Sequence, residues 1–127
     1  MPYVELHLHS CYSFLDGASH PVEIAGAAAQ QEHAALALTD HDGLHGAMEH
    51  AQACSSLGIR PITGAEITLD DGSHITLLCE DATGYRNLCL LLTESHAGTR
   101  EWSGANTRRP RRSGGGCSAP SARSASG

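Results

Sequence analysis

The stretch YVELHLHS at residues 3–10 is the part of the sequence that decides the fold. It predicts an apolar strand that ends in two histidines, His7 and His9. Side chains two positions apart in a strand point to the same face, so the two imidazoles are expected to converge on one point. Converging imidazoles are typical of a metal site.

Two later apolar runs also stop at metal-binding residue types. The run at 36–41 ends in His41, the run at 61–66 ends in Glu66, and the first loop offers Asp16. In barrels of alternating strands and helices, functional groups gather where the strands end. Imidazole and carboxylate suit Zn, Mn or Fe, and several such ligands would hold more than one ion. Paired metal ions activate water and clamp a phosphoester, so the pattern predicts phosphoester hydrolysis.

Each of these residues also has a structural interpretation. A His-x-His pair on a strand can be coincidental, and Asp16-Gly17 is the kind of pair that forms an ordinary turn. Ligand-type residues at three consecutive strand ends favour the metal interpretation. The spacing of His41 and His45 suggests a helical zinc motif, but Gly43 between them and the lack of a following glutamate argue against it. The remaining histidines are predicted to be surface or capping residues: His20, His33, His50 and His74.

Helices and strands are predicted to alternate up to about residue 95. Helices are expected at about 21–32, 44–57 and 83–95, and further strands at 34–39, 60–69 and 74–79, the last two joined by a DDGS turn. Two strand–helix units in succession imply a parallel sheet and an α/β fold. The predicted buried stripes are Leu44, Ala47, Met48, Ala51 and Cys54 on the second helix, and Tyr85, Leu88, Leu91 and Leu92 on the third.

Composition sets further bounds. At 127 residues, with 40% hydrophobic residues, the chain allows one domain with a core. Residues 1–96 hold 13 of the 14 acidic residues and two of the eight basic ones, so this part alone is not expected to bind DNA strongly. Five cysteines without CxxC spacing argue against a disulfide framework. With no signal segment and no run of about 20 apolar residues, a cytoplasmic protein without membrane contact is expected.

The segment at residues 100–127 differs in kind. It carries an arginine run at 108–112 within Gly, Ser, Ala and Pro, and it has no periodicity, so we expect disorder. The run could bind nucleic acid or an anionic partner. Our hypothesis is that this ending is frame-shifted, because all pattern is lost there. An unbroken reading frame in an independent isolate would count against it.

Four phrases together resemble the polymerase-and-histidinol-phosphatase (PHP) domain family: LHLHS at 6–10, FLDG at 14–17, ALTDHDG at 37–43 and GAE at 64–66. The phrase ATGYRNLC at 82–89, followed by Leu92-Thr93, is similar to the N-terminal PHP domain of bacterial DNA polymerase III alpha subunits, and above all to the error-prone homologue. The resemblance covers about residues 2–99.

The resemblance implies a distorted seven-stranded (β/α)7 barrel with up to three zinc or manganese ions at its mouth. Residues 1–99 would form its N-terminal part, with the first three to four strands and three helices. The implied ligands are His7, His9, Asp16, His41 and Glu66, with His96 as a sixth, and no catalytic residue separate from them. The later cysteine and the Asp-x-His pair that complete the family's cluster do not appear in this sequence.

The function implied is that of a truncated PHP domain from an error-prone, translesion DNA polymerase of replication and repair. The intact parent would act on DNA and contact other polymerase or clamp-associated proteins, whereas the fragment is expected to lack polymerase activity and efficient hydrolysis. One alternative is a stand-alone PHP phosphatase for histidinol phosphate or a nucleotide. The other is a metal-free scaffold, which metal analysis of the purified protein distinguishes.

Overall fold

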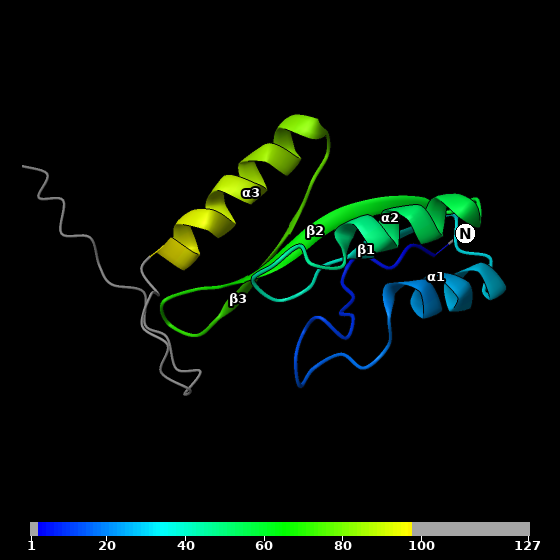
Figure 1. The fold of residues 1–127 in the computed structure, drawn as a ribbon, viewed down its shortest axis with the longest axis horizontal. Helices are drawn as coiled ribbons and strands as arrows, with labels where there is room; N and C mark the ends of the chain where they lie inside the picture. The colour runs from blue at the N-terminus through cyan, green and yellow to red at the C-terminus, as the bar shows by residue number, and fades with distance from the viewer. Residues whose placement is uncertain (1–2, 98–127) are drawn as a thin grey trace, which may run out of the picture.

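The computed structural model describes residues 3–97, and the segment predicted to be disordered, 100–127, lies outside the described residues. The elements are α1 (Pro21–Gln30), β1 (Ala35–Leu38), α2 (Ala47–Ser56), β2 (Arg60–Thr68), β3 (His74–Leu78) and α3 (Ala82–Ala97). Helices α1 and α2 lie together at one end of the sheet and α3 at the other (Figure 1). This mixed arrangement is the predicted α/β class.

The described sheet has the strand order β1-β2-β3. Strands β1 and β2 are parallel, as predicted for successive strand–helix units, and Leu38 pairs with Thr63. Strands β2 and β3 form an antiparallel hairpin in which Thr68 pairs with His74. The turn closes when the Leu69 amide donates to the Ser73 carbonyl at 2.8 Å.

The segment at 3–10 runs beside β1 but is less regular than the predicted strand. It makes one isolated parallel bridge, between Glu5 and Leu36. Further along, the Thr39 amide donates to the Leu8 carbonyl at 2.8 Å, and the Leu8 amide donates to the Thr39 hydroxyl at 2.9 Å. Because a side chain accepts the Leu8 amide where a strand would use a backbone carbonyl, the regular ladder is interrupted. The segment nevertheless carries its histidines past the end of β1.

The helices follow the predicted order with shifted ends. The His20 amide donates to the Glu23 carboxylate at 2.8 Å at the start of α1. Helix α2 begins at Ala47, three residues later than predicted, after tightly packed Gly46, where a Cβ would lie 2.9 Å from the Tyr12 ring. The Asp81 side chain accepts the Gly84 amide and caps α3. Of the helices in the described range, none has the length and apolar character needed to cross a membrane.

Two apolar clusters hold these elements together. The first joins β1 to α1 and α2 and consists of Ala25, Ala28, Leu36, Cys54 and Ile59. The second joins β2 to α3 and consists of Ala65, Ile67, Leu88 and Leu92. Three predicted core positions were wrong, because Met48, Tyr85 and Leu91 are exposed. The prediction of His50 as a surface or capping residue was also wrong, because its side chain is buried on α2. Since alternate residues of β2 point to opposite faces, α3 covers the face of Ile67 and leaves the other face to Glu66.

Candidate metal centre

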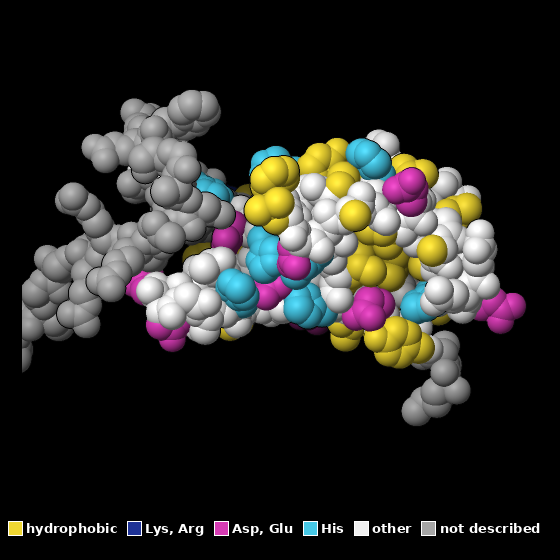
Figure 2. All heavy atoms as spheres, turned by 90° about the horizontal axis from the view of Figure 1, so that it is seen from below, with side chains coloured by type: hydrophobic (Ala, Val, Ile, Leu, Met, Phe, Trp, Pro, Cys, Tyr) yellow, Lys and Arg dark blue, Asp and Glu magenta, His cyan; other side chains and the backbone are white. Residues whose placement is uncertain are grey.

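The candidate site lies where the chain leaves β1 and passes the C-terminal part of β2. His41 and Glu66 form a parallel bridge. The Glu66 amide donates to the Asp40 carbonyl at 3.0 Å, and the Asp42 amide donates to the Glu66 carbonyl at 2.8 Å. This pairing brings the ligand-type residues of two strands together, and histidine and acidic side chains gather on the same face of the molecule (Figure 2).

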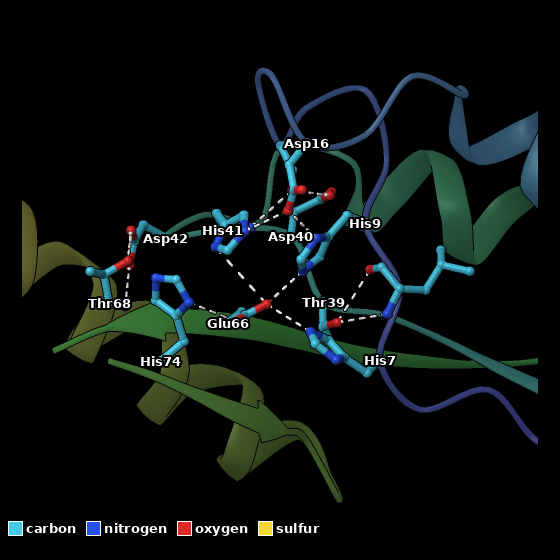
Figure 3. Close-up of polar contacts among 12 residues, drawn as sticks. His7, His9, Asp16, Thr39, Asp40, His41, Asp42, Glu66, Thr68 and His74 are labelled. Carbon is cyan, nitrogen blue, oxygen red and sulfur yellow. Dashed lines mark hydrogen bonds and ion pairs between the residues drawn. The ribbon is translucent and has the colours of Figure 1, made fainter. Parts of the chain in front are cut away.

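The carboxylate of Glu66 is at the centre of the site (Figure 3). Its Oε2 lies 2.7 Å from His7 Nε2, 2.6 Å from His9 Nε2 and 4.0 Å from His41 Nδ1. Its Oε1 lies 3.2 Å from His74 Nδ1. The Glu66 side chain is only 8% exposed, so four imidazoles surround a carboxylate that is almost withdrawn from solvent.

Asp16 supplies a second carboxylate from the loop before α1. Its Oδ2 lies 2.6 Å from His9 Nδ1 and 2.8 Å from His41 Nε2. The Asp16 side chain is 52% exposed, in contrast to the buried Glu66. His9 therefore lies between two carboxylates, one facing solvent and one facing the sheet.

The number of protons on His9 limits what these contacts can be. A neutral imidazole has one N–H donor and one lone pair. Because both ring nitrogens of His9 face carboxylate oxygens at 2.6 Å, neutral His9 can donate to only one of them. The other contact would set two lone pairs against each other, a repulsion that is relieved when both atoms bind a shared cation. This donor set fits a divalent metal ion.

Three overlapping groups of side chains could each hold an ion. They are His7, His9 and Glu66; His9, Asp16 and His41; and His41, Glu66 and His74. In each group the ligand atoms lie within 4.8 Å of one another. Neighbouring groups share His9, His41 or Glu66, as expected for adjacent ions. The structure thus brings together five of the six residues expected to be ligands, and metal binding by them remains a prediction.

His96, the sixth expected ligand, lies elsewhere in the described part of the chain. Its Nε2 donates to the backbone carbonyl of Asp42 at 2.7 Å, and the residue belongs to none of the three groups found within residues 3–97. Asp42 in turn accepts the Thr68 amide and hydroxyl at 2.8 and 2.7 Å. His96 therefore connects α3 to the edge of the site, and its role as a ligand remains a prediction.

His74 is a site residue that sequence reasoning missed by placing it among the surface and capping histidines. The hairpin register pairs Thr68 with His74 and Glu66 with Thr76. Residues paired across two strands lie on the same face, and so do residues two apart on one strand. His74 must therefore share the face of Glu66. The signal that would have found it is the DDGS turn: counting outward from the turn along both strands pairs His74 with Thr68, which is on the face of Glu66.

A buried carboxylate supports the loop that carries Asp16. Asp40, which is almost fully buried, accepts the Ser10 amide at 2.6 Å, the Ser10 hydroxyl at 2.7 Å and the Ser13 hydroxyl at 2.7 Å. The His41 amide donates to the Ser13 hydroxyl at 3.0 Å. This network ties the end of the first segment to the end of β1 and fixes the directions of His9 and His41.

Both carboxyl groups of the site are held in their ionised form. Hydrogen bonds from His41 and His9 lower the pKa of Asp16 below its ordinary value. Burial raises the pKa of Glu66, but the hydrogen bonds from His7 and His9 and the nearby imidazole charges outweigh it, so the net shift is downward. At neutral pH both carboxyl groups are therefore ionised, which is the form in which they bind a cation.

Comparisons with known proteins agree with this arrangement. The PHP domain model matches residues 5–113. The chain is 47% identical over 98 residues to an error-prone DNA polymerase of Symbiobacterium thermophilum, covering 77% of this chain and 9% of that protein. It is 44% identical over 106 residues to the error-prone DNA polymerase of Mycolicibacterium paratuberculosis, covering 76% and 10%. The chain thus spans about a tenth of the length of these relatives.

Solved structures show the same fold. An amidohydrolase from Chromobacterium violaceum, solved with bound sulfate and no metal, matches with a TM-score of 0.61 and 36% identity over 75% of this chain and 34% of its own. A protein from Bifidobacterium adolescentis assigned as a metal-dependent phosphoesterase matches in fold with a TM-score of 0.57 and 22% identity, over 74% of this chain and 33% of its own. These matches confirm the predicted fold class, part of a PHP-type barrel.

Proposed function

The chain belongs to the PHP domain family, and from this premise we propose that it carries a divalent-metal centre for phosphoester hydrolysis. The proposed ligands are His7, His9, Asp16, His41 and Glu66, joined by His74. The observation that carries the proposal is the position of His9 between two carboxylates, each at 2.6 Å. The mixture of imidazole nitrogen and carboxylate oxygen suits zinc or manganese.

The different exposure of Glu66 and Asp16 indicates different roles for the two carboxylates. When bound, the metal would lower the pKa of a water molecule and offset the negative charge of a phosphate. Glu66 is buried against the sheet and orients His7 and His9, whereas Asp16 is half exposed. We therefore expect the phosphate group to approach from the side of Asp16.

The polymerase relatives suggest a larger context. We propose that residues 1–99 correspond to the N-terminal PHP region of an error-prone DNA polymerase, with residues 100–127 as a separate segment. The identities of 44–47% to two such polymerases support this assignment. DNA would then be the substrate of the parent protein, in translesion synthesis in the cytoplasm.

A metal-free scaffold is the second candidate, and one observation favours it. If His9 carried two protons, it could donate to Glu66 and Asp16 together and close the site with ion pairs alone. The cluster would then stabilise the fold without binding a cation. Metal analysis separates the two functions, because only the first requires a bound ion.

The test is to titrate the purified chain with Mn²⁺ and Zn²⁺ and to measure binding by calorimetry. Elemental analysis then gives the number of metal ions bound per chain. We expect at least one ion per chain in the wild type and less metal in His9→Ala, which loses a ligand from two of the three groups. Wild-type binding is expected in His20→Ala, which removes an exposed histidine outside the three groups. Because the later ligands of the family cluster do not appear in this sequence, hydrolysis of bis(p-nitrophenyl) phosphate should be slow, and it should be lost when the metal is removed. A wild-type chain without stoichiometric metal would leave the scaffold function in place of the metal centre.

A further inference from the structure

Two large apolar side chains stand in solvent on the loop that carries Asp16. Phe14 is 86% exposed and Leu15 is 92% exposed, and they immediately precede Asp16. We call these two residues the apolar tip. Hydrophobic side chains also lie next to the histidine and acidic side chains on the face shown in Figure 2. Exposed apolar groups at the rim of a polar site commonly mark a binding surface.

The apolar tip is held in place by the loop around it. The Ser13 amide donates to the Ser10 carbonyl, and the Gly17 amide donates to the Ser13 carbonyl, both at 2.9 Å. A Cβ on Gly17 would overlap the Ser10 carbonyl oxygen, so the two ends of the loop are in close contact. Leu15 itself has a φ of 68°, in the left-handed region that side chains disfavour. The loop therefore presents both apolar side chains to solvent, and at Leu15 its backbone is held in an unfavourable conformation.

The charges near the site restrict which ligand fits. Residues 3–97 contain two basic side chains other than histidine, Arg60 and Arg86. Arg60 begins β2, six residues before Glu66, and Arg86 lies on α3, which packs on the opposite face of β2. Within these residues, neither arginine is placed to hold a phosphate at the site. A phosphate ester would depend on the metal centre for its phosphate and on the apolar tip for the rest of the molecule.

We propose that the apolar tip binds the aromatic base of a nucleotide whose phosphate is held at the metal centre. This inference rests on the function proposed above and names its substrate class as nucleotide phosphoesters. A base has a flat π-face that stacks on an exposed aromatic ring whatever its sequence. Phe14 is two residues from Asp16, a Cα separation of at most about 7.6 Å, and a nucleotide extends over a comparable distance from phosphate to base.

The test compares ligands that differ only in the base. The full chain, loaded with Mn²⁺, is titrated by calorimetry with thymidine 5′-phosphate, deoxyribose 5-phosphate and inorganic phosphate. The wild type should bind thymidine 5′-phosphate roughly 5- to 150-fold more tightly than deoxyribose 5-phosphate, the range expected for one base stacked on an aromatic ring. Phe14→Ala should bind both sugar phosphates equally, and Phe14→Trp should restore the preference.

A matched control removes an exposed apolar side chain elsewhere. Leu90 on α3 is 60% exposed, and Leu90→Ala should keep the wild-type preference. If the wild type binds inorganic phosphate but shows no preference for the base, or if Phe14→Ala keeps the preference, the inference is overturned and the metal centre stands. The apolar tip would then be a contact for another protein segment. If the metal-loaded wild type binds none of the three ligands, the proposed function fails and this inference fails with it.

Discussion

Replacing Asp40 by alanine should destabilise the fold more than any exposed acidic substitution. The buried Asp40 carboxylate accepts three hydrogen bonds, from the Ser10 amide, the Ser10 hydroxyl and the Ser13 hydroxyl. Hydrogen bonds to a charged group contribute about 1.5–3 kcal/mol each, and part of the loss is offset because a buried charge is removed. The expected fall in the free energy of unfolding is about 3–5 kcal/mol, a large part of the total stability of a small domain.

Asp40→Asn should cost less, about 1–2 kcal/mol, because its amide oxygen still accepts two of the three hydrogen bonds and the Ser10 hydroxyl can turn to accept the third. The matched control is Asp71→Ala. Asp71 also accepts an amide and a hydroxyl, both from Ser73, but it is exposed. Its loss should leave the urea midpoint close to that of the wild type, as is usual for surface substitutions without a cavity or a buried partner.

The assay is urea unfolding followed by far-UV circular dichroism. With a denaturant dependence of about 1–3 kcal/mol per M, the Asp40→Ala midpoint should fall by more than about 1 M. The reasoning is refuted if Asp40→Ala and Asp71→Ala unfold at the same urea concentration, because burial would then contribute nothing to the strength of the network.

Further expectations concern helix ends, pH and metal content. Glu32 just after α1 has a φ of 58°, and Gly58 just after α2 has a φ of 74°. Because glycine adopts positive φ without strain, Glu32→Gly should raise the free energy of unfolding by about 0.5–1 kcal/mol, and Gly58→Ala should lower it by about 1 kcal/mol. Urea unfolding measures both changes, and a destabilised Glu32→Gly would contradict the argument. Burial lowers the pKa of His50, so around that pKa the folded protein binds fewer protons than the unfolded chain. Its contribution to stability should be full above the ordinary histidine pKa of about 6.5 and should fall as the pH drops from there towards the lowered pKa. If the free energy of unfolding of His50→Gln depends on pH with the same slope, His50 is not the origin of the effect. Elemental analysis should show that His74→Ala, which affects one ligand group, keeps more metal than His9→Ala, which affects two; equal losses would mean that the groups do not act separately.

Most elements could be predicted from local pattern, whereas the buried helix faces could not be predicted fully. The apolar periodicity of α3 marks four candidate core positions, yet only Leu88 and Leu92 are buried. Helix α3 packs on Ala65 and Ile67 of β2, a narrow surface that covers one pair of turns and leaves Tyr85 and Leu91 in solvent. Periodicity gives the direction of an apolar stripe, but the width of the covering neighbour decides how much of the stripe is buried.

The first segment shows a similar limit. The alternation at residues 3–10 correctly brings His7 and His9 onto Glu66, because spacing alone sets which side chains share a face. Its regularity as a strand depended on Thr39, whose hydroxyl takes the Leu8 amide in place of a backbone carbonyl. The side chain of Thr39, which follows β1, interrupts the strand pairing, and no pattern within residues 3–10 predicts this contact.

In the candidate site, the spacing of side chains along each strand determines some contacts, and the register between β2 and β3 determines others. Side-chain spacing and strand ends were enough to bring His41 to Glu66, because parallel strands deliver their carboxyl ends to one edge. His74 depends instead on the length of the β2–β3 turn, since a shift of one residue would turn it towards α3. The turn therefore does more than close a hairpin: its length decides whether Glu66 faces a fourth imidazole, and with it whether the third ligand group exists.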